Sequence, residues 1–279
     1  MAKNSKLIIC ATPIGNLSDC SQRLQSALDC ADTIYAEDTR VTAKLLNHLQ
    51  VKTPLKRLDE NLMDNKASQV INEVAGGKTI AYCTDAGTPG VSDPGLKLVA
   101  AAQNANVEVE VIPGPTAAIT AYVASGFTNQ HFYFGAFLPR KAAEIKETIT
   151  ALSNLDAVLI FYESPKRLFA SIKAIAEVMP DVEIAICREL TKVHEQVIRG
   201  TANDQIRKIE KQDALKGEIV LCINSKGINA TGPSSEEIFS FAEKLANEGC
   251  KTSLISEVLC TAFDISKNEA KKVALNAKK

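Results

Sequence analysis

The chain has 279 residues, 46% of them hydrophobic, which is enough to bury the core of one large domain or of two smaller ones. This apolar content excludes a disordered or fibrous protein. The 32 basic and 33 acidic residues leave a formal charge of −1, so the chain lacks the basic excess that alone would indicate nucleic-acid binding.

The eight cysteines and the start of the chain indicate a protein of the reducing cytoplasm. No pair forms C-x-x-C and five cysteines lie in apolar runs, so we expect buried thiols and neither a disulfide framework nor a metal site. These five are Cys10, Cys83, Cys187, Cys222 and Cys260. Residues 1–6 lead directly into a short apolar run, and no run approaches the roughly 18 apolar residues of a membrane helix, so we expect neither export nor a membrane span.

The first predicted strand is Leu7–Cys10, a run too short and too apolar for anything but a buried strand. The loop after it, residues 11–19, contains one glycine, Gly15, and one proline. It stands where a dinucleotide-binding protein carries G-x-G-x-x-G, so the sequence disfavours NAD as a cofactor.

A helix and a second strand lead to a charged loop. Arg23–Ala31 has apolar residues at helical spacing, and Asp32–Ala36 is the next predicted strand. The loop that follows contains Glu37, Asp38, Thr39 and Arg40. Two acids and an arginine at a strand end are candidates for a functional site; alternatively, Asp38 or Thr39 caps a helix that runs through Leu46.

The most informative loop is Asp85–Gly95, which follows a predicted helix, Asn65–Ala75, and a predicted strand, Thr79–Cys83. Its three glycines permit a left-handed backbone and its two prolines fix φ, so the loop has a defined shape. Asp93 followed by Pro94 predicts a capped helix start. Free N–H groups and two carboxylates at the mouth of a sheet favour a ligand site, and the alternative is a tight turn that binds nothing.

The alternation of strand, loop and helix continues with a helix over Leu96–Ala105, a strand over Val107–Ile112 and a helix over Ala117–Ala124. Small residues at the start of the last helix would let a flat ligand lie against it. Because such crossovers are right-handed, the pattern predicts an α/β fold with a parallel sheet whose loops gather at one edge.

Residues 126–141 mark a predicted domain junction. Five of the fourteen Phe and Tyr residues, counted as nine Phe plus five Tyr, concentrate there: Phe127, Phe132, Tyr133, Phe134 and Phe137. These rings favour an interdomain core, and the alternative is stacking on a nucleobase.

Beyond the junction the pattern again alternates. We expect two helices and three strands: Ala142–Ser153 and Pro165–Val178, then Ala157–Tyr162, Glu183–Cys187 and Glu218–Ile223. Ser164 before Pro165 predicts the N-cap of the second helix. Two further charged loops, residues 163–167 and 188–195, follow strands. Exposure to solvent readily explains one charged loop, but it explains less easily three of them at strand ends, counting the loop at residues 37–40.

The C-terminal part is predicted to be a separate helical unit. Residues 224–233 have the composition of a linker. Three short helices follow, over Ser235–Asn247, Thr252–Phe263 and Lys267–Leu275. With lysines concentrated near the C-terminus they resemble a helix-turn-helix, and an equally good alternative is a helical cap or an oligomer arm.

Taken together, the loops resemble those of the tetrapyrrole methylase superfamily. The matching segments are Thr12–Leu17 with Asp19, Ala36–Arg40, Asp85–Gly95, Pro113–Ala117, Phe137–Lys141, Tyr162–Arg167, Arg188–Lys192 with Glu195, and Lys216–Glu218. Several rare motifs occur in the same order, so the resemblance is highly specific. Two positions depart from the pattern, Ala136 where a glycine is expected and Lys166 where histidine is commoner.

Within the superfamily the resemblance is to the branch that methylates the 2′-hydroxyl of a cytidine in small-subunit (16S) ribosomal RNA. It implies two α/β domains, residues 1–118 and 119–225, with S-adenosylmethionine in the cleft between them, and a small helical domain over residues 234–279. It also implies a homodimer whose partner is small-subunit ribosomal RNA or the small subunit, with no membrane. A methyl donor that is cationic at sulfur and zwitterionic at one end suits backbone polar groups, small residues and apolar walls.

The resemblance further implies roles for particular residues. Cofactor contacts would come from Ile14, Asp85, Val91, Thr116, Ala117 and Leu168. Candidates for removing the ribose proton are Glu37, Asp38, Glu189 and Lys192, and the sequence does not say which carboxylate is the base. RNA phosphates would be held by Arg40, Arg140, Arg167 and Arg188.

Two other functions stay open. One is a methyltransferase of the same fold that acts on a tetrapyrrole or a protein side chain, which would not need the charged loops and the basic tail. The other is a non-catalytic RNA-binding assembly factor. Titration with S-adenosylmethionine separates this last alternative, because a pure binding module should show no cofactor heat.

Overall fold

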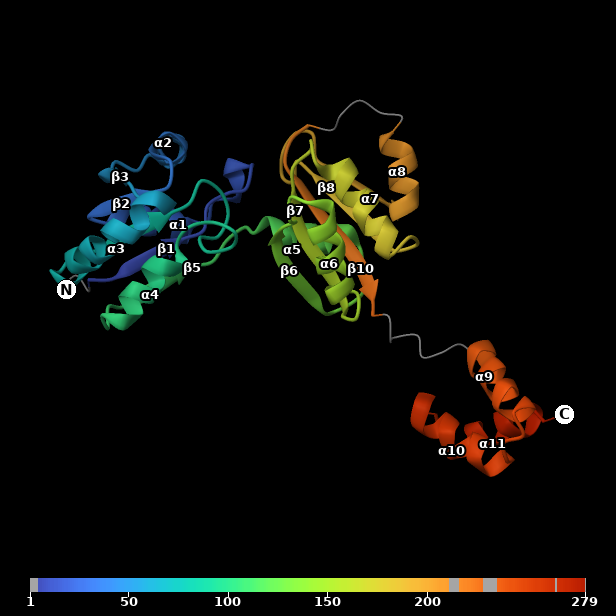
Figure 1. The fold of residues 1–279 in the computed structure, drawn as a ribbon. Helices are drawn as coiled ribbons and strands as arrows, with labels where there is room; N and C mark the ends of the chain where they lie inside the picture. The colour runs from blue at the N-terminus through green and yellow to red at the C-terminus, as the bar shows by residue number, and fades with distance from the viewer. Residues whose placement is uncertain (1–4, 211–215, 228–234, 264, 279) are drawn as a thin grey trace. The chain divides into compact units, whose positions relative to one another are not determined.

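The structure is a computed structural model, and it describes residues 5–210, 216–227, 235–263 and 265–278 (Figure 1). The chain divides into two compact units, Met1–Ile149 with Val158–Asn224, and Thr150–Ala157 with Ser225–Lys279. Most of the predicted linker, residues 228–233, lies outside the described residues, as does Lys279. None of the helices in these described stretches has the length and hydropathy of a membrane-spanning segment.

The first sheet is parallel, with its strands in the order β3-β2-β4-β1-β5. The strands are β1 (Leu7–Cys10), β2 (Thr33–Ala36), β3 (Leu55–Arg57), β4 (Ile80–Cys83) and β5 (Val109–Ile112). β1, β2 and β4 are buried at every residue, which explains their apolar sequences, because a parallel sheet is covered on both faces. The predicted α/β fold is confirmed. β3 was not predicted, since it is a three-residue edge strand with two basic residues.

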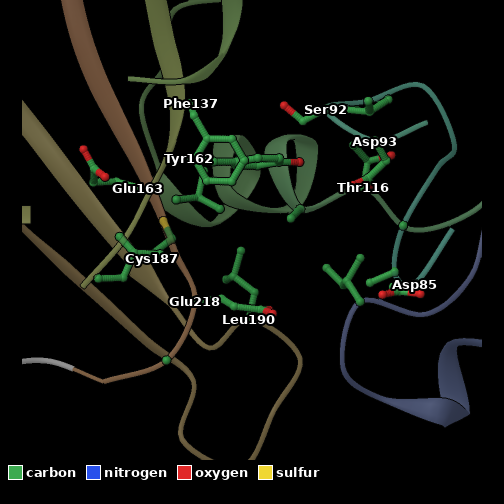
Figure 2. A pocket seen from close by; sticks show the side chains of 18 of the residues that line it. Asp85, Ser92, Asp93, Thr116, Phe137, Tyr162, Glu163, Cys187, Leu190 and Glu218 are labelled. Atoms are coloured by element: carbon green, nitrogen blue, oxygen red, sulfur yellow. The ribbon is translucent and has the colours of Figure 1, made fainter. Parts of the chain in front are cut away.

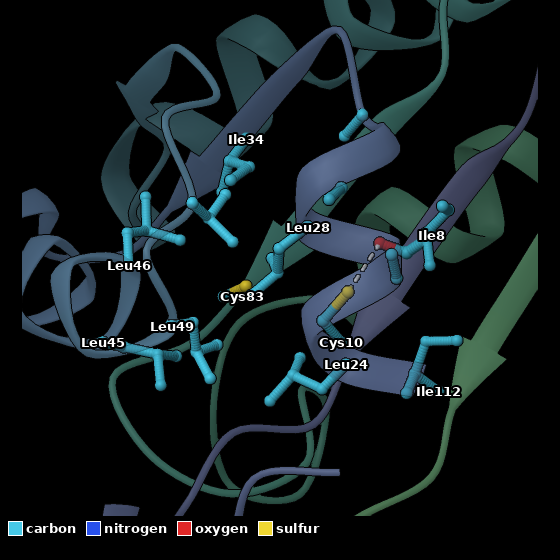
Figure 3. Packing of buried hydrophobic residues seen from close by; sticks show 14 residues of the cluster. Ile8, Cys10, Leu24, Leu28, Ile34, Leu45, Leu46, Leu49, Cys83 and Ile112 are labelled. Atoms are coloured by element: carbon cyan, nitrogen blue, oxygen red, sulfur yellow. Dashed lines mark hydrogen bonds between the residues drawn. The ribbon is translucent and has the colours of Figure 1, made fainter. Parts of the chain in front are cut away.

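Helices cover both faces of this sheet. They are α1 (Gln22–Cys30), α2 (Thr39–Leu49), α3 (Glu60–Ala75) and α4 (Leu96–Asn104). Ile8 and Cys10 of β1 pack with apolar residues of α1 and α2 on one face (Figure 3). Leu7 and Ile9 pack with residues of α3 and α4 on the other. Side chains of a strand alternate between its faces, so one four-residue run serves both cores.

The second sheet is mixed, with the order β6-β7-β10-β8-β9. Its strands are β6 (Phe132–Phe137), β7 (Asp156–Glu163), β8 (Glu183–Arg188), β9 (Gln196–Thr201) and β10 (Ile219–Lys226). β6 and β7 are parallel, whereas β8 is antiparallel to both β9 and β10. β9 was missed in the sequence because no residue of this edge strand is fully buried, so it shows no clear apolar alternation.

The helices that follow the first sheet are α5 (Ala117–Ser125), α6 (Ala142–Leu152), α7 (Leu168–Val178) and α8 (Ala202–Ile209). α5 follows β5 in the chain but packs with the second sheet, because Ala118 and Ala121 share a core with Val158 and Ala185. The predicted domain boundary between residues 118 and 119 falls within this helix. The division into residues 1–118, 119–225 and 234–279 stays a prediction.

The three predicted C-terminal helices are present as α9 (Ser235–Asn247), α10 (Thr252–Phe263) and α11 (Lys267–Asn276). They share a core of their own, built from Ile238, Ala242, Ile255, Leu259, Ala270 and Ala274. Their likeness to a helix-turn-helix stays a prediction. Cys260, which was expected to be buried, is only half-buried in α10, whereas the other four cysteines expected in apolar cores are buried.

Candidate functional site

A cavity of about 420 Å³ in the larger unit is lined by residues at the strand ends of both sheets (Figure 2). Residues from the first sheet follow β1, β4 and β5. Residues from the second sheet come from the ends of β6, β7 and β8 and from the start of β10. The volume is typical of small-molecule pockets, which measure about 300 to 1,000 Å³. The loops predicted to form a ligand site therefore line this cavity, and the site itself stays a prediction.

The loops of the first sheet that line the cavity are connected to one another by hydrogen bonds. Thr12 and Gly87 exchange backbone hydrogen bonds of 2.9 and 3.0 Å, which tie the loop after β1 to the loop after β4. The Thr88 hydroxyl lies 3.0 Å from the Thr116 hydroxyl and donates to the Pro115 carbonyl oxygen at 3.2 Å, which adds the loop after β5. Gly87 has a φ of 79°, a conformation that favours glycine.

Asp93 lines this wall and does not cap a helix as predicted (Figure 2). α4 begins at Leu96, and its N-cap residue, Gly95, has a φ of 141°. Ser92 is also left-handed, with a φ of 67°. Because the chain turns at both positions, no helix starts at Pro94. The Asp93 carboxylate therefore caps no helix and lines the cavity.

Carboxylates dominate the polar part of the lining. Four lining residues are acidic, Asp85, Asp93, Glu163 and Glu218, and none of the described residues in the lining is lysine, arginine or histidine. Burial, with the negative charges of Glu37 and Asp85 adding to it, raises the pKa of Asp93 to about 6. Burial also raises the pKa of Glu37 and of Asp85. A bound cation would favour the ionised carboxylates, so this lining favours a positively charged ligand.

Glu163 is the buried acid of the lining, with 3% of the residue exposed. Its carboxylate accepts hydrogen bonds from Ser171 Oγ at 2.5 Å and from Arg167 Nη2 at 3.3 Å. The same Arg167 nitrogen donates to the carbonyl oxygens of Leu138 and Pro139, at 2.8 and 2.5 Å. A buried carboxylate is thus paired with a cation and a hydroxyl at the end of β7.

The start of α7 differs from the prediction. The Ser164 N–H donates to Glu163 Oε1 at 2.6 Å, and the Ser164 carbonyl oxygen accepts from the N–H groups of Arg167 and Leu168, both at 3.0 Å. Residues 164–167 therefore form a turn that satisfies these groups locally. The helix begins at Leu168, three residues after the predicted start at Pro165.

The charged loop after β8 is organised around Glu189. Glu189 Oε1 accepts from Lys192 Nζ and from the Glu218 N–H, both at 2.9 Å, and Lys192 Nζ also donates to Glu218 Oε2 at 2.9 Å. A Cβ atom on Gly217 would lie 2.4 Å from Glu189 Cδ, and one on Gly15 would lie 2.6 Å from Lys192 Cγ. Because Gly15 follows β1, this packing brings loops of the two sheets into contact.

These contacts set the ionisation of both groups. The hydrogen bond from the Glu218 N–H, followed by that from Lys192, lowers the pKa of Glu189. Burial lowers the pKa of Lys192, but its hydrogen bonds to Glu218 and Glu189 outweigh burial and raise the pKa overall. Lys192 is therefore held in its charged form, which makes it a poor proton acceptor.

Asp38 caps α2, as one of the two alternatives predicted. Its carboxylate accepts from the Arg40 N–H at 2.8 Å and pairs with the Arg40 guanidinium at 2.5 Å. These contacts with Arg40 hold the pKa of Asp38 far below its usual range. The Asp38 N–H donates to Asp85 Oδ1 at 3.0 Å, which links this loop to the cavity.

Known proteins resemble this chain in sequence or in fold. The sequence profile of the Tetrapyrrole (Corrin/Porphyrin) Methylases matches residues 6–205. The chain belongs to this family. A Thermotoga maritima protein named Ribosomal RNA small subunit methyltransferase I is 38% identical over 221 residues, which cover 79% of this chain and 99% of the relative. A protein of the same name from Halalkalibacterium halodurans is 39% identical, over 79% of this chain and 76% of the relative.

Solved structures show the same fold at lower identity. A crystal structure of diphthine synthase matches with a TM-score of 0.63 and 16% identity, over 79% of this chain and 90% of that one. Methyl transfer is the activity common to the family name and to the names of the relatives, and tetrapyrrole methylases use S-adenosylmethionine. The cavity fits that cofactor. Its lining is acidic and contains no basic residue among the described residues, which suits the sulfonium and ammonium groups of S-adenosylmethionine.

Five of the six residues expected to contact the cofactor line the cavity: Ile14, Asp85, Val91, Thr116 and Ala117. Leu168 does not line it. It is the first residue of α7 and is 1% exposed, because the turn at residues 164–167 brings the helix start into the protein interior. The contacts of these residues with the cofactor stay a prediction.

None of the four candidate catalytic residues lines the cavity in this tetrapyrrole methylase, but each acts on a residue that does. Asp38 bonds to Asp85, and Glu189 and Lys192 bond to Glu218. The negative charge of Glu37 raises the pKa of Asp93. Three of the candidates thus bond to lining residues, and Glu37 acts on Asp93 through its charge.

The four candidate RNA-binding arginines differ in how much of each is free to bind. Arg40 and Arg140 are exposed, and the Arg40 guanidinium donates to the Asp38 carboxylate from Nε and Nη2. Arg167 is engaged at Nη2 by two carbonyl oxygens and Glu163. Arg188 Nη1 donates to the Lys216 carbonyl oxygen at 3.0 Å, and its buried Nε has no partner within the described part of the chain.

Several lining residues were not assigned a role from the sequence, among them Tyr162, Glu163, Leu190 and Glu218. Each stands within a motif at a strand end, so its position was the available signal.

The aromatic residues of the predicted domain junction do not all lie in a core. Phe127 is buried in the core of the second sheet, whereas Phe137 is 57% exposed. Phe137 lines the cavity, with its ring 5.5 Å from that of Tyr162 at an angle of 72°.

Proposed function

We propose that the chain methylates the 2′-hydroxyl of a cytidine in small-subunit ribosomal RNA, with S-adenosylmethionine bound in the cavity. The observation that supports this most directly is the cavity, which is acidic and otherwise largely apolar and is lined by five of the expected cofactor residues. Relatives named for small-subunit ribosomal RNA, at 38% and 39% identity, support the choice of substrate. The cofactor, when bound, supplies the methyl group.

The lining suggests how the chain would hold that cofactor. The carboxylates of Asp85 and Asp93 would favour its cationic groups. Ile14 and Val91 would provide apolar contacts, and the small side chain of Ala117 would leave room for a flat ring. Much of the rate enhancement would come from this fixed orientation of the cofactor relative to the ribose oxygen.

Glu37 is the best proton acceptor among the four candidates. Burial, followed by the charge of Asp85, raises its pKa, and a general base works best when its pKa approaches the working pH. The pKa of Asp38 is held far below its usual range and that of Glu189 is lowered, so both carboxylates are weaker bases. Lys192 would act as a cation, orienting Glu189 and Glu218.

The remaining partners follow from the substrate. Exposed Arg40 and Arg140 would bind RNA phosphates, and Arg188 would add a third cation beside the β8 loop. The substrate would be the small subunit or its RNA, and the enzyme would act in the cytoplasm as a homodimer.

Calorimetric titration with S-adenosylmethionine tests where the cofactor binds. Asp85→Ala combined with Gly90→Val should abolish binding, because Gly90 has a φ of 91° and a Cβ there would lie 2.7 Å from Leu96 Cδ2. Lys173→Ala, an exposed position on α7, is the control and should bind as the wild type does. Unchanged affinity in the double variant would place the cofactor elsewhere, and no binding by the wild type would favour a non-catalytic assembly factor.

A further inference from the structure

We infer that Arg167 is a positioning residue and not a ligand of RNA phosphates: with Glu163 it fastens the loop after β6 to the end of β7 and thereby fixes one wall of the cavity. The inference rests on the proposed function, because it assigns a role within the proposed cofactor site. It also removes Arg167 from the cations expected to contact RNA.

One nitrogen of Arg167 makes all of the contacts that define this role. Nη2 lies 2.8 Å from the Leu138 carbonyl oxygen, 2.5 Å from that of Pro139 and 3.3 Å from Glu163 Oε2. A guanidinium Nη carries two hydrogens, so three acceptors already share them. Nη2 therefore has no hydrogen left for a phosphate, and the salt dependence of RNA binding tests whether the three hydrogens on Nε and Nη1 bind one.

The carboxylate of Glu163 explains why Arg167 is held in this place. Its side chain has 0% of its surface exposed, and a buried charge is tolerated only when it is paired and hydrogen-bonded. Ser171 Oγ from α7 and the Ser164 N–H supply further hydrogen bonds at 2.5 and 2.6 Å. Removing Arg167 would leave the carboxylate buried without the one cation that bonds to it among the described residues.

The pairing of β6 with β7 is irregular where this contact forms. The register shifts between Phe134 and Phe137, and regular pairing resumes only with Phe137 opposite Tyr162. The Leu138 N–H then donates to the Tyr162 carbonyl oxygen at a long 3.4 Å. Backbone pairing is therefore weak at this end of β6, and the hydrogen bonds from Arg167 supply the connection that the ladder lacks.

The fastened segments border the cavity directly. Phe137, Tyr162 and Glu163 all belong to its lining (Figure 2). If the loop after β6 came loose, the edge-to-face contact of the Phe137 and Tyr162 rings would be lost with it. The same loop carries exposed Arg140, so its placement also decides where that cation is presented to RNA.

Two binding measurements on purified variants test the inference. We expect Arg167→Ala and Glu163→Gln each to weaken S-adenosylmethionine binding roughly tenfold by calorimetry. The loss in the double variant should be smaller than the sum of the two single losses, because the two residues share the Arg167–Glu163 contact. Arg167→Lys should recover part of the affinity, since an ammonium group also donates to several acceptors. Lys173→Ala on α7 is the control.

The second measurement is the salt dependence of binding to small-subunit ribosomal RNA. A phosphate ligand contributes about 0.7 to 1 to the slope of log K against log salt. Arg140→Ala should reduce the slope by that amount, whereas Arg167→Ala should keep the wild-type slope. In steady-state assays Arg167→Ala should raise KM for S-adenosylmethionine about tenfold and leave kcat near the wild-type value, a split that general loss of folding would not produce.

Wild-type cofactor affinity in Arg167→Ala, together with a slope reduced as in Arg140→Ala, would overturn the inference. If Arg167→Ala does not fold, Arg167→Met, which keeps most of the side-chain length and leaves the lining carboxylates in place, decides the question: lowered cofactor affinity with the wild-type salt slope supports the positioning role, and unchanged affinity refutes it. A wild-type chain that binds the cofactor but no small-subunit RNA would refute the proposed substrate, while the cofactor titrations would still decide the role of Arg167.

Discussion

The ionisation of Asp93 links the cavity to the stability of the chain. Burial and the neighbouring charges of Glu37 and Asp85 raise its pKa from 3.8 to about 6. Because the folded state binds this proton more tightly than the unfolded state, the contribution of Asp93 to stability is fully present below about pH 4. It is lost as the pH rises through the folded pKa of about 6.

Asp93→Asn should therefore raise the free energy of unfolding at pH 7 by about 1 to 2 kcal/mol and should leave it unchanged near pH 4. The expected gain is smaller than the full pKa shift implies, because solvent partly screens the half-buried carboxylate. Urea unfolding without cofactor at both pH values measures the difference. The same variant should bind S-adenosylmethionine more weakly at pH 7, because a carboxylate has been lost. Asp181→Asn, at an exposed turn residue before β8, is the control. Lower stability of Asp93→Asn at pH 7 would show that the ionised carboxylate is stabilised in the fold.

If a side chain accepts the proton of the ribose hydroxyl, we expect it to be Glu37. Glu37→Gln is expected to slow methyl transfer to bound RNA by roughly 10² to 10⁴, the usual contribution of a general base. Single-turnover rates with saturating cofactor and RNA measure this, with Asp38→Asn, Glu189→Gln and Lys192→Met tested in parallel. If all four variants keep near-wild-type rates, orientation alone accounts for catalysis and no general base lies in these loops.

At the scale of elements, β6 contains a local distortion. Ala136 has a φ of 55°, within the interval of β6 where the register to β7 shifts. A left-handed conformation disfavours residues with a Cβ atom, which explains why a glycine is expected there. Gly135 beside it is required for another reason, because a Cβ at that position would lie 2.2 Å from Phe161 Cε1.

Ala136→Gly should increase the free energy of unfolding by about 1 kcal/mol, since relief of the left-handed strain exceeds the entropy that glycine adds to the unfolded chain. Ala170→Gly, at an exposed site in α7, should decrease it by a similar amount. Denaturant titrations of both variants measure the two effects. A decrease in Ala136→Gly as large as that in Ala170→Gly would mean that the bulge does not strain the alanine.

The sequence predicted the elements whose signal is local. β1, β2 and β4 were found because each is an apolar run buried on both faces, and the cofactor loops because they follow such strands. The predicted helix start at Pro94 was wrong because Ser92 and Gly95 have positive φ. A sequence pattern for helix capping does not reveal the φ of individual residues. The partners of Arg167 were also out of reach, since they depend on carbonyl oxygens 28 and 29 residues away.

At the scale of the whole molecule, the C-terminal helices should add RNA affinity without taking part in catalysis. α9, α10 and α11 have a core of their own, and four lysines at or beyond α11 are exposed: Lys267, Lys271, Lys272 and Lys278. A chain ending at residue 227 should bind small-subunit RNA more weakly and with a lower salt slope, and should keep its affinity for S-adenosylmethionine. Loss of cofactor binding in the shortened chain would instead make the tail part of the cofactor-binding unit.

The central claim is that this tetrapyrrole methylase modifies a ribose oxygen of small-subunit ribosomal RNA. Mass spectrometry of nucleosides released from that RNA, after incubation with the wild-type chain and S-adenosylmethionine, tests it most directly. The proposed function predicts 2′-O-methylcytidine, with the methyl group on the sugar, and none with the Asp85→Ala, Gly90→Val variant. A methyl group on a nucleobase, or RNA left unmodified by a wild-type chain that binds the cofactor, would contradict the claim.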